Sequence, residues 1–130
     1  MYRSFLTVVS ILGACYGIGG ILATDPLLAA YGITPDATAV VAVRMLCAAY
    51  LGVAVVNWLL RDAREAEVVR ANAIGNAIGW SLTLAIVLLT SLSRLLSPMG
   101  LAGLAIQVLF TLGWAYFAMH QEERRVASTA

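Results

Sequence analysis

Residues 4–24, SFLTVVSILGACYGIGGILAT, form an uncharged stretch that Arg3 and Asp25 enclose. A helix rises about 1.5 Å per residue, so about 20 apolar residues cross a hydrocarbon core about 30 Å thick. Three further apolar stretches lie at 38–60, which holds the single charge of Arg44, at 71–93 and at 98–120, the last beginning at Pro98. The sequence therefore predicts an all-α membrane protein, a four-transmembrane-helix bundle that forms one domain over residues 1–130.

The composition supports lipid as the solvent of this chain. Hydrophobic residues make up 62% of it and charged residues 12%, whereas soluble domains are about 45–50% apolar and about 25% charged. The net charge is +1 and the arginines are scattered, so the clustered basic face that nucleic acids require is missing. We expect membrane lipids among the partners and no nucleic acid.

Arginine placement predicts the orientation, because cytoplasmic loops carry an excess of basic residues. Arg44 and Arg94 belong to one side of the predicted bundle. The other side has six arginines: Arg3, Arg61, Arg64, Arg70, Arg124 and Arg125. The six-to-two division places both termini and the middle loop in the cytoplasm.

The longest connection, DPLLAAYGITPD at residues 25–36, predicts a short helix at the membrane interface. Asp25-Pro26 is expected to stop the first span, and Gly32 to end a helix of one or two turns. Thr34 is predicted to be the N-cap of the second span, with Pro35 at its first helical position. The polar tail after Gln121 is expected to be frayed.

Small residues recur at helical spacing and predict close packing between helices in lipid. Gly13 and Gly17 form a G-x-x-x-G motif that Gly20 extends, and Gly75 and Gly79 form a second one. Gly52 repeats the spacing with Ala48. These stripes could pack inside one bundle or against a neighbouring subunit, and the sequence leaves both open.

Arg44 is the one charged residue inside a predicted span. Charges at this position are costly and therefore suggest a role. Arg44 could form an ion pair with Asp25 or Asp36, or extend its side chain to the headgroups. Alternatively, it could hold an anionic or polar ligand.

Four amides are the other polar candidates within the spans. Asn72 and Asn76 are four residues apart on one helix face, and Asn57 near the end of the second span could meet them. Gln107 lies midway along the fourth span. Hydrogen bonds between helices account for such residues, and the alternative is a polar pocket for a headgroup, a quinone or a substrate.

Several kinds of chemistry lack their residues in this sequence. No Asp or Glu lies inside a predicted span, His120 is the only histidine, and Cys15 and Cys47 form no C-x-x-C motif. The pattern offers no metal ligand set and no nucleophile with an adjacent base. We therefore predict no catalytic residues, no metal and no cofactor, and a protein that is not an enzyme.

The order of several features resembles the DoxX-like small four-helix membrane proteins. These features are Asp25-Pro26, Tyr31-Gly32, Arg44, Gly52 and Arg61-Asp62. The resemblance implies a four-helix bundle in the bacterial inner membrane and no single activity, since some relatives accompany membrane oxidoreductases and others act as membrane chaperones.

The functional expectation is a non-catalytic accessory or structural subunit of a larger bacterial inner-membrane complex, which binds other membrane subunits or itself. One alternative is a small membrane protein that binds a lipid, a quinone or another hydrophobic ligand. A homo-oligomeric transporter or channel is a third possibility.

Overall fold

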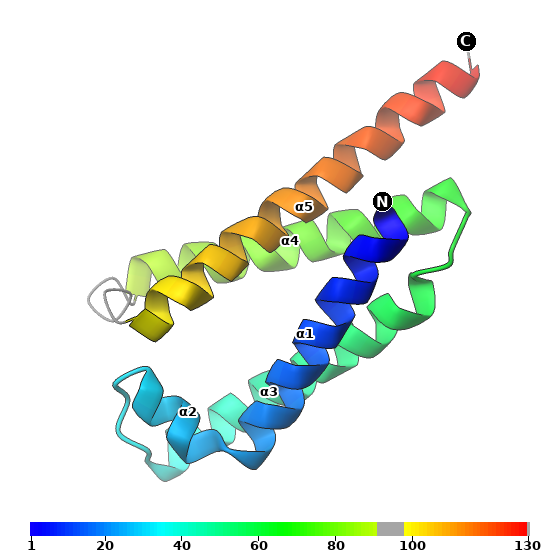
Figure 1. Cartoon of the computed structure of the whole chain (residues 1–130). Coiled ribbons are helices and arrows are strands. Elements are labelled where there is room, and N and C mark those ends of the chain that lie inside the picture. The colour runs from blue at the N-terminus through cyan, green and yellow to red at the C-terminus, as the bar shows by residue number, and fades with distance from the viewer. Residues whose placement is uncertain (91–97, 130) are drawn as a thin grey trace. The chain divides into compact units, whose positions relative to one another are not determined.

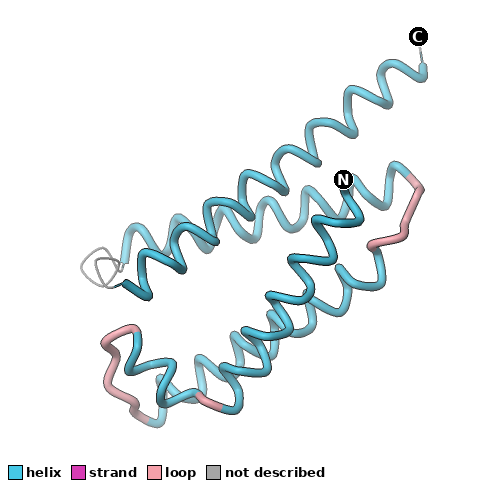
Figure 2. The backbone as a smooth tube through the Cα atoms, in the orientation of Figure 1, coloured by secondary structure: helices cyan, strands magenta, loops and turns pink. Residues whose placement is uncertain are grey.

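The computed structural model describes residues 1–90 and 98–129 of the chain, and it contains five helices in these ranges (Figure 1). They are α1 (Tyr2–Leu22), α2 (Thr24–Ala30), α3 (Ala37–Leu60), α4 (Ala66–Thr90) and α5 (Pro98–Thr129). No strand occurs in the described residues. Figure 2 shows that loops take up only short connections between the helices.

Four of these helices are long and apolar enough to cross a membrane. The candidate spans are Tyr2–Leu22, Ala37–Leu60, Ala66–Leu89 and Gly100–His120. The predicted all-α membrane protein with four spans is confirmed. Some helices extend past the charges that bound the predicted spans, because a helix can continue into the headgroup region with its backbone hydrogen bonds intact. Accordingly, α4 starts at Ala66, five residues before the predicted span.

The chain divides into two compact units, Met1–Arg61 and Asp62–Ala130. The first unit is a hairpin of α1 and α3 with α2 between them, and the second is a hairpin of α4 and α5. That both belong to one domain stays a prediction.

The break between α1 and α2 falls at Ala23, whose φ of −125° and ψ of 47° interrupt the helix. The predicted role of Asp25-Pro26 was therefore wrong. Both residues lie in the first turn of α2, where proline costs no hydrogen bond because the first backbone N–H groups have no intrahelical acceptor. The predicted short helix between the first two spans is present.

Gly32 ends α2 as the sequence predicted, with a φ of +68°. Its N–H donates to Ala29 O at 2.9 Å, and the N–H of Ile33 donates to Leu28 O at 2.9 Å. These two bonds form a Schellman motif, in which glycine adopts the left-handed conformation without steric penalty. The chain thereby turns from α2 towards α3.

The N-cap of α3 is Asp36, not Thr34. The Asp36 side chain accepts a hydrogen bond from the Ala39 backbone N–H at 2.8 Å, and α3 begins at Ala37. Both Thr and Asp are good caps, so the choice depends on where the preceding turn delivers the chain. Pro35 consequently lies outside the helix, and its predicted place at the first helical position was wrong.

The start of α5 at Pro98 agrees with the prediction. The helix continues to Thr129, so the tail predicted to be frayed is helical. Its residues 121–127 read QEERRVA, and Gln, Glu, Arg and Ala are strong helix formers. The third connection, including Arg94, lies at 91–97, outside the described residues.

Candidate functional site

In the first hairpin, α1 approaches α3 closely through the face that carries Gly13, Gly17 and Gly20. A Cβ placed at Gly17 would lie 2.9 Å from the carbonyl oxygen of Cys47, and one at Gly13 would lie 3.2 Å from Ala54 Cβ. A Cβ at Gly20 would overlap the Cys47 Sγ. Gly13, Gly17 and Gly20 therefore pack α1 directly on α3, inside the hairpin.

The other three predicted packing glycines have no such contact. A Cβ at Gly52, Gly75 or Gly79 would meet nothing within 4 Å among the described residues. Which helix or subunit these three glycines pack against therefore stays a prediction. In the second hairpin, the α4 residue with printed contacts to α5 is Trp80, whose ring meets Phe110.

Arg44 contacts α2 and not a carboxylate. Its Nε donates to Thr24 Oγ1 at 3.2 Å, and the Thr24 hydroxyl donates to Gly20 O at 2.7 Å. In the described residues no ion pair joins Arg44 to Asp25 or Asp36. Neither of these two candidate ion pairs therefore forms within the described part of the chain. The Asp36 carboxylate caps α3 instead, and the buried Thr24 hydroxyl lies at the level of Arg44.

Thr24 is the residue of this site that the sequence analysis missed. Its signal was its place at the end of the first uncharged stretch, four residues after Gly20, on the same predicted side of the membrane as Arg44. A threonine in a helix commonly donates to the carbonyl four residues earlier. Its oxygen then keeps a lone pair for a second donor, which here is Arg44.

Asn72 and Asn76 are joined within α4. The Asn76 Nδ2 donates to Asn72 O at 2.9 Å and to Asn72 Oδ1 at 3.0 Å. These two hydrogen bonds both lie within α4. Asn57 is fully buried and belongs to the first hairpin, so its predicted meeting with Asn72 and Asn76 stays a prediction.

Gln107 makes the interhelical hydrogen bond that its mid-span position suggested. Its Nε2 donates to the Trp80 carbonyl oxygen at 3.1 Å and links α5 to α4. The Trp80 ring also meets Phe110 edge to face, with centroids 5.1 Å apart. These contacts hold the second hairpin together, so Gln107 is part of its packing.

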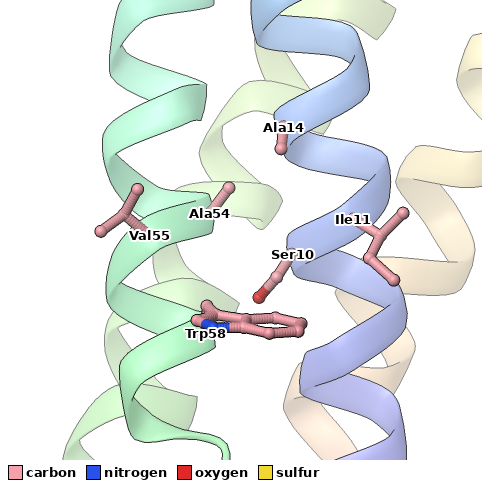
Figure 3. A pocket seen from close by; sticks show the side chains of 6 residues that line it. All are labelled: Ser10, Ile11, Ala14, Ala54, Val55 and Trp58. Atoms are coloured by element: carbon pink, nitrogen blue, oxygen red, sulfur yellow. The ribbon is translucent and has the colours of Figure 1, made fainter.

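An open apolar groove of about 240 Å³ lies between α1 and α3 (Figure 3). Ser10, which is 3% exposed, is its only polar lining side chain among the described residues. The full lining is Ser10, Ile11, Ala14, Ala54, Val55 and Trp58. One hydroxyl among apolar groups supplies shape for an apolar chain and no acid or base.

Within the described residues, no three His, Cys, Asp or Glu side chains gather as metal ligands would. Cys47 is buried and Cys15 exposed, and both are free.

Comparison with protein-family models, with curated proteins and with solved structures finds no match to this chain.

Proposed function

We propose that this chain is a non-catalytic subunit of a larger membrane assembly. The observation that carries the proposal is the contrast between the two glycine motifs. The motif of α1 packs against α3, whereas a Cβ at Gly75 or Gly79 of α4 would meet nothing within 4 Å in its own hairpin. A small-residue face in lipid favours close approach of another helix.

The exposure of the second hairpin supports this proposal. Only 6% of the apolar stretch of α4 is buried, and the same share of the apolar stretch of α5. Lipid tails can cover such a surface without small residues on it. A glycine pair additionally allows the backbone of a neighbouring helix to approach closely. The lack of Asp and Glu inside the predicted spans, with His120 as the only histidine, supports the non-catalytic part of the proposal.

The proposal is tested with Gly79→Leu in the full chain, extracted in a mild detergent. The leucine should reduce the recovery of a stoichiometric membrane partner several-fold, while the thermal unfolding of the purified chain stays unchanged. Gly19→Leu is the matched control, because a Cβ at Gly19 also meets nothing within 4 Å. That variant should leave recovery unchanged.

Two outcomes would contradict the proposal. If the wild-type chain is extracted without any stoichiometric partner, it is not a subunit. If Gly79→Leu destabilises the isolated chain, the α4 face is packed inside the molecule, and the contrast between the two motifs has no bearing on partners.

The location is part of the same proposal. We infer the bacterial inner membrane, in line with the resemblance to DoxX-like proteins, and a cytoplasmic position for both termini, in line with the arginine count. A cysteine introduced at Asp62 should be labelled by a membrane-impermeant reagent only after the cells are opened, and one at Thr34 in intact spheroplasts. The reverse pattern would contradict this orientation.

A further inference from the structure

Arg44 places a full positive charge on an exposed side of α3, a helix long and apolar enough to cross a membrane. It is the eighth residue of α3, so about 10 Å of helix lies between it and the start at Ala37. Its side chain is exposed, as are those of Val41 and Met45. A guanidinium with apolar neighbours on a span is costly unless an anion or water satisfies it.

The guanidinium is held in place by one of its five donors. The Nε–H bonds to Thr24 Oγ1, whose own proton is donated to Gly20 O. Thr24 is 2% exposed, so this anchor is fixed by the hairpin. In the described residues Arg44 has no carboxylate partner. The four N–H groups on its two Nη atoms are therefore directed to a ligand or solvent.

The pairing of α1 with α3 sets the depth of this group. Gly20 packs against Cys47, so Arg44, about one turn earlier in α3, lies at the level where α1 ends at Leu22. The uncharged stretch of the first span also ends there, at Thr24. This is the boundary at which long basic side chains reach lipid headgroups.

A track of small residues continues from Arg44 along the same side of α3. Ala48 and Gly52 follow at intervals of four, so the three residues share a helix face. Both are exposed, and a Cβ at Gly52 would meet nothing within 4 Å in the described chain. The charge and the shallow apolar track together match a molecule with an anionic head and a hydrocarbon tail.

We propose that Arg44 and Thr24 form a binding site for the phosphate of a membrane phospholipid, with an acyl chain lying along Ala48 and Gly52. The planar guanidinium bonds two oxygens of one phosphate at once, which an ammonium group cannot reproduce. Thr24 orients the guanidinium. This site is independent of the α4 face and of the proposed subunit role.

The test is native mass spectrometry of the full chain, purified in a non-ionic detergent and offered defined lipids. Wild type should retain one phosphatidylglycerol per chain and should not retain a galactosyl diacylglycerol, which has the same tails without phosphate. Arg44→Gln should weaken phosphatidylglycerol retention at least tenfold, and Arg44→Lys should weaken it less. Millimolar inorganic phosphate should not displace the lipid, because it has no acyl chain.

Two further variants keep the result interpretable. Gly52→Leu leaves Arg44 intact and fills the track, so it should also weaken retention. Arg61→Gln is the control at the other end of α3, where Arg61 Nη1 already donates to Trp58 O at 2.7 Å and the guanidinium lies 3.9 Å from the centroid of the Trp58 ring. It should leave retention unchanged.

Several results would overturn the inference. Equal retention by wild type and Arg44→Gln would remove the site. Equal retention of the galactolipid would show that phosphate is not recognised. Displacement by inorganic phosphate alone would identify a site for the free anion instead of a lipid.

Discussion

Glycine and cysteine decide how closely α1 and α3 approach. At Gly17 a Cβ would stand 2.9 Å from Cys47 O and 3.1 Å from Leu51 Cβ. The carbonyl belongs to the α3 backbone and cannot rotate away, so the helices would have to separate. In lipid, where helix association depends on such packing contacts, this separation costs stability.

Gly17→Ala is therefore expected to destabilise the chain, with Gly19→Ala as its matched control. Both substitutions gain the same helix propensity, and a Cβ at Gly19 meets nothing within 4 Å. Only Gly17→Ala forces the helices apart. The free energy of unfolding of this variant should therefore be about 1–3 kcal/mol lower than that of Gly19→Ala. The measurement is unfolding in mixed micelles of a denaturing detergent, followed by circular dichroism. Equal stability of the two variants would show that α1 and α3 do not pack through this face.

At the scale of the helix, capping determines where α3 begins. Asp36 and Thr34 are both residues that favour an N-cap, but only the Asp36 side chain meets the Ala39 N–H, at 2.8 Å. After the Schellman turn at Gly32, α3 starts at Ala37 and not at Pro35, two residues later than the sequence suggested.

Asp36→Ala should lower the free energy of unfolding by about 1 kcal/mol, because the N–H groups of the first turn lose an acceptor. Thr34→Ala is the control and should change stability by less than about half that amount, since no side-chain hydrogen bond of Thr34 occurs within the described part of the chain. The same unfolding assay distinguishes the two variants. A larger loss for Thr34→Ala would contradict the observed cap.

At the scale of the molecule, the chain consists of two helical hairpins, and each has its own means of cohesion. The first uses glycines against an α3 backbone, and the second uses the Gln107 hydrogen bond and the Trp80–Phe110 ring contact. Contacts of this kind are local to each hairpin. The first hairpin is therefore expected to form without the second.

This expectation is tested by a disulfide between Gly13→Cys and Ala54→Cys, in a chain whose Cys15 and Cys47 are replaced by Ala. A Cβ at Gly13 lies 3.2 Å from that of Ala54, close to the ~3.8 Å typical of disulfides. Mild oxidation should cross-link the full chain and residues 1–61 alone to the same extent. The pair Gly19→Cys and Ala54→Cys should remain reduced. A cross-link confined to the full chain would show that the second hairpin is needed to form the first.

The sequence identified Arg44 as a candidate residue but did not predict its hydrogen-bond partner. Arg44 was identifiable because a charge inside an apolar stretch is conspicuous, and its partners were sought among the nearest carboxylates in the sequence. The observed partner, Thr24, lies 20 residues away, at the start of α2, and no sequence motif marked the helix break at Ala23. A hydroxyl can take the place of a carboxylate as the hydrogen-bond acceptor of an arginine.

The sequence by itself determined that the chain lies in lipid, that it is all-α and that it has four spans. Lipid requires long apolar segments whose backbone groups form their hydrogen bonds within each helix. The sequence also located the turn at Gly32, since only glycine adopts that backbone conformation freely. Only the tertiary structure decided which glycines are used, since G-x-x-x-G motifs look alike until a second helix packs on one of them. It likewise decided the partner of Arg44, because hydrogen bonding depends on which groups lie at the same depth.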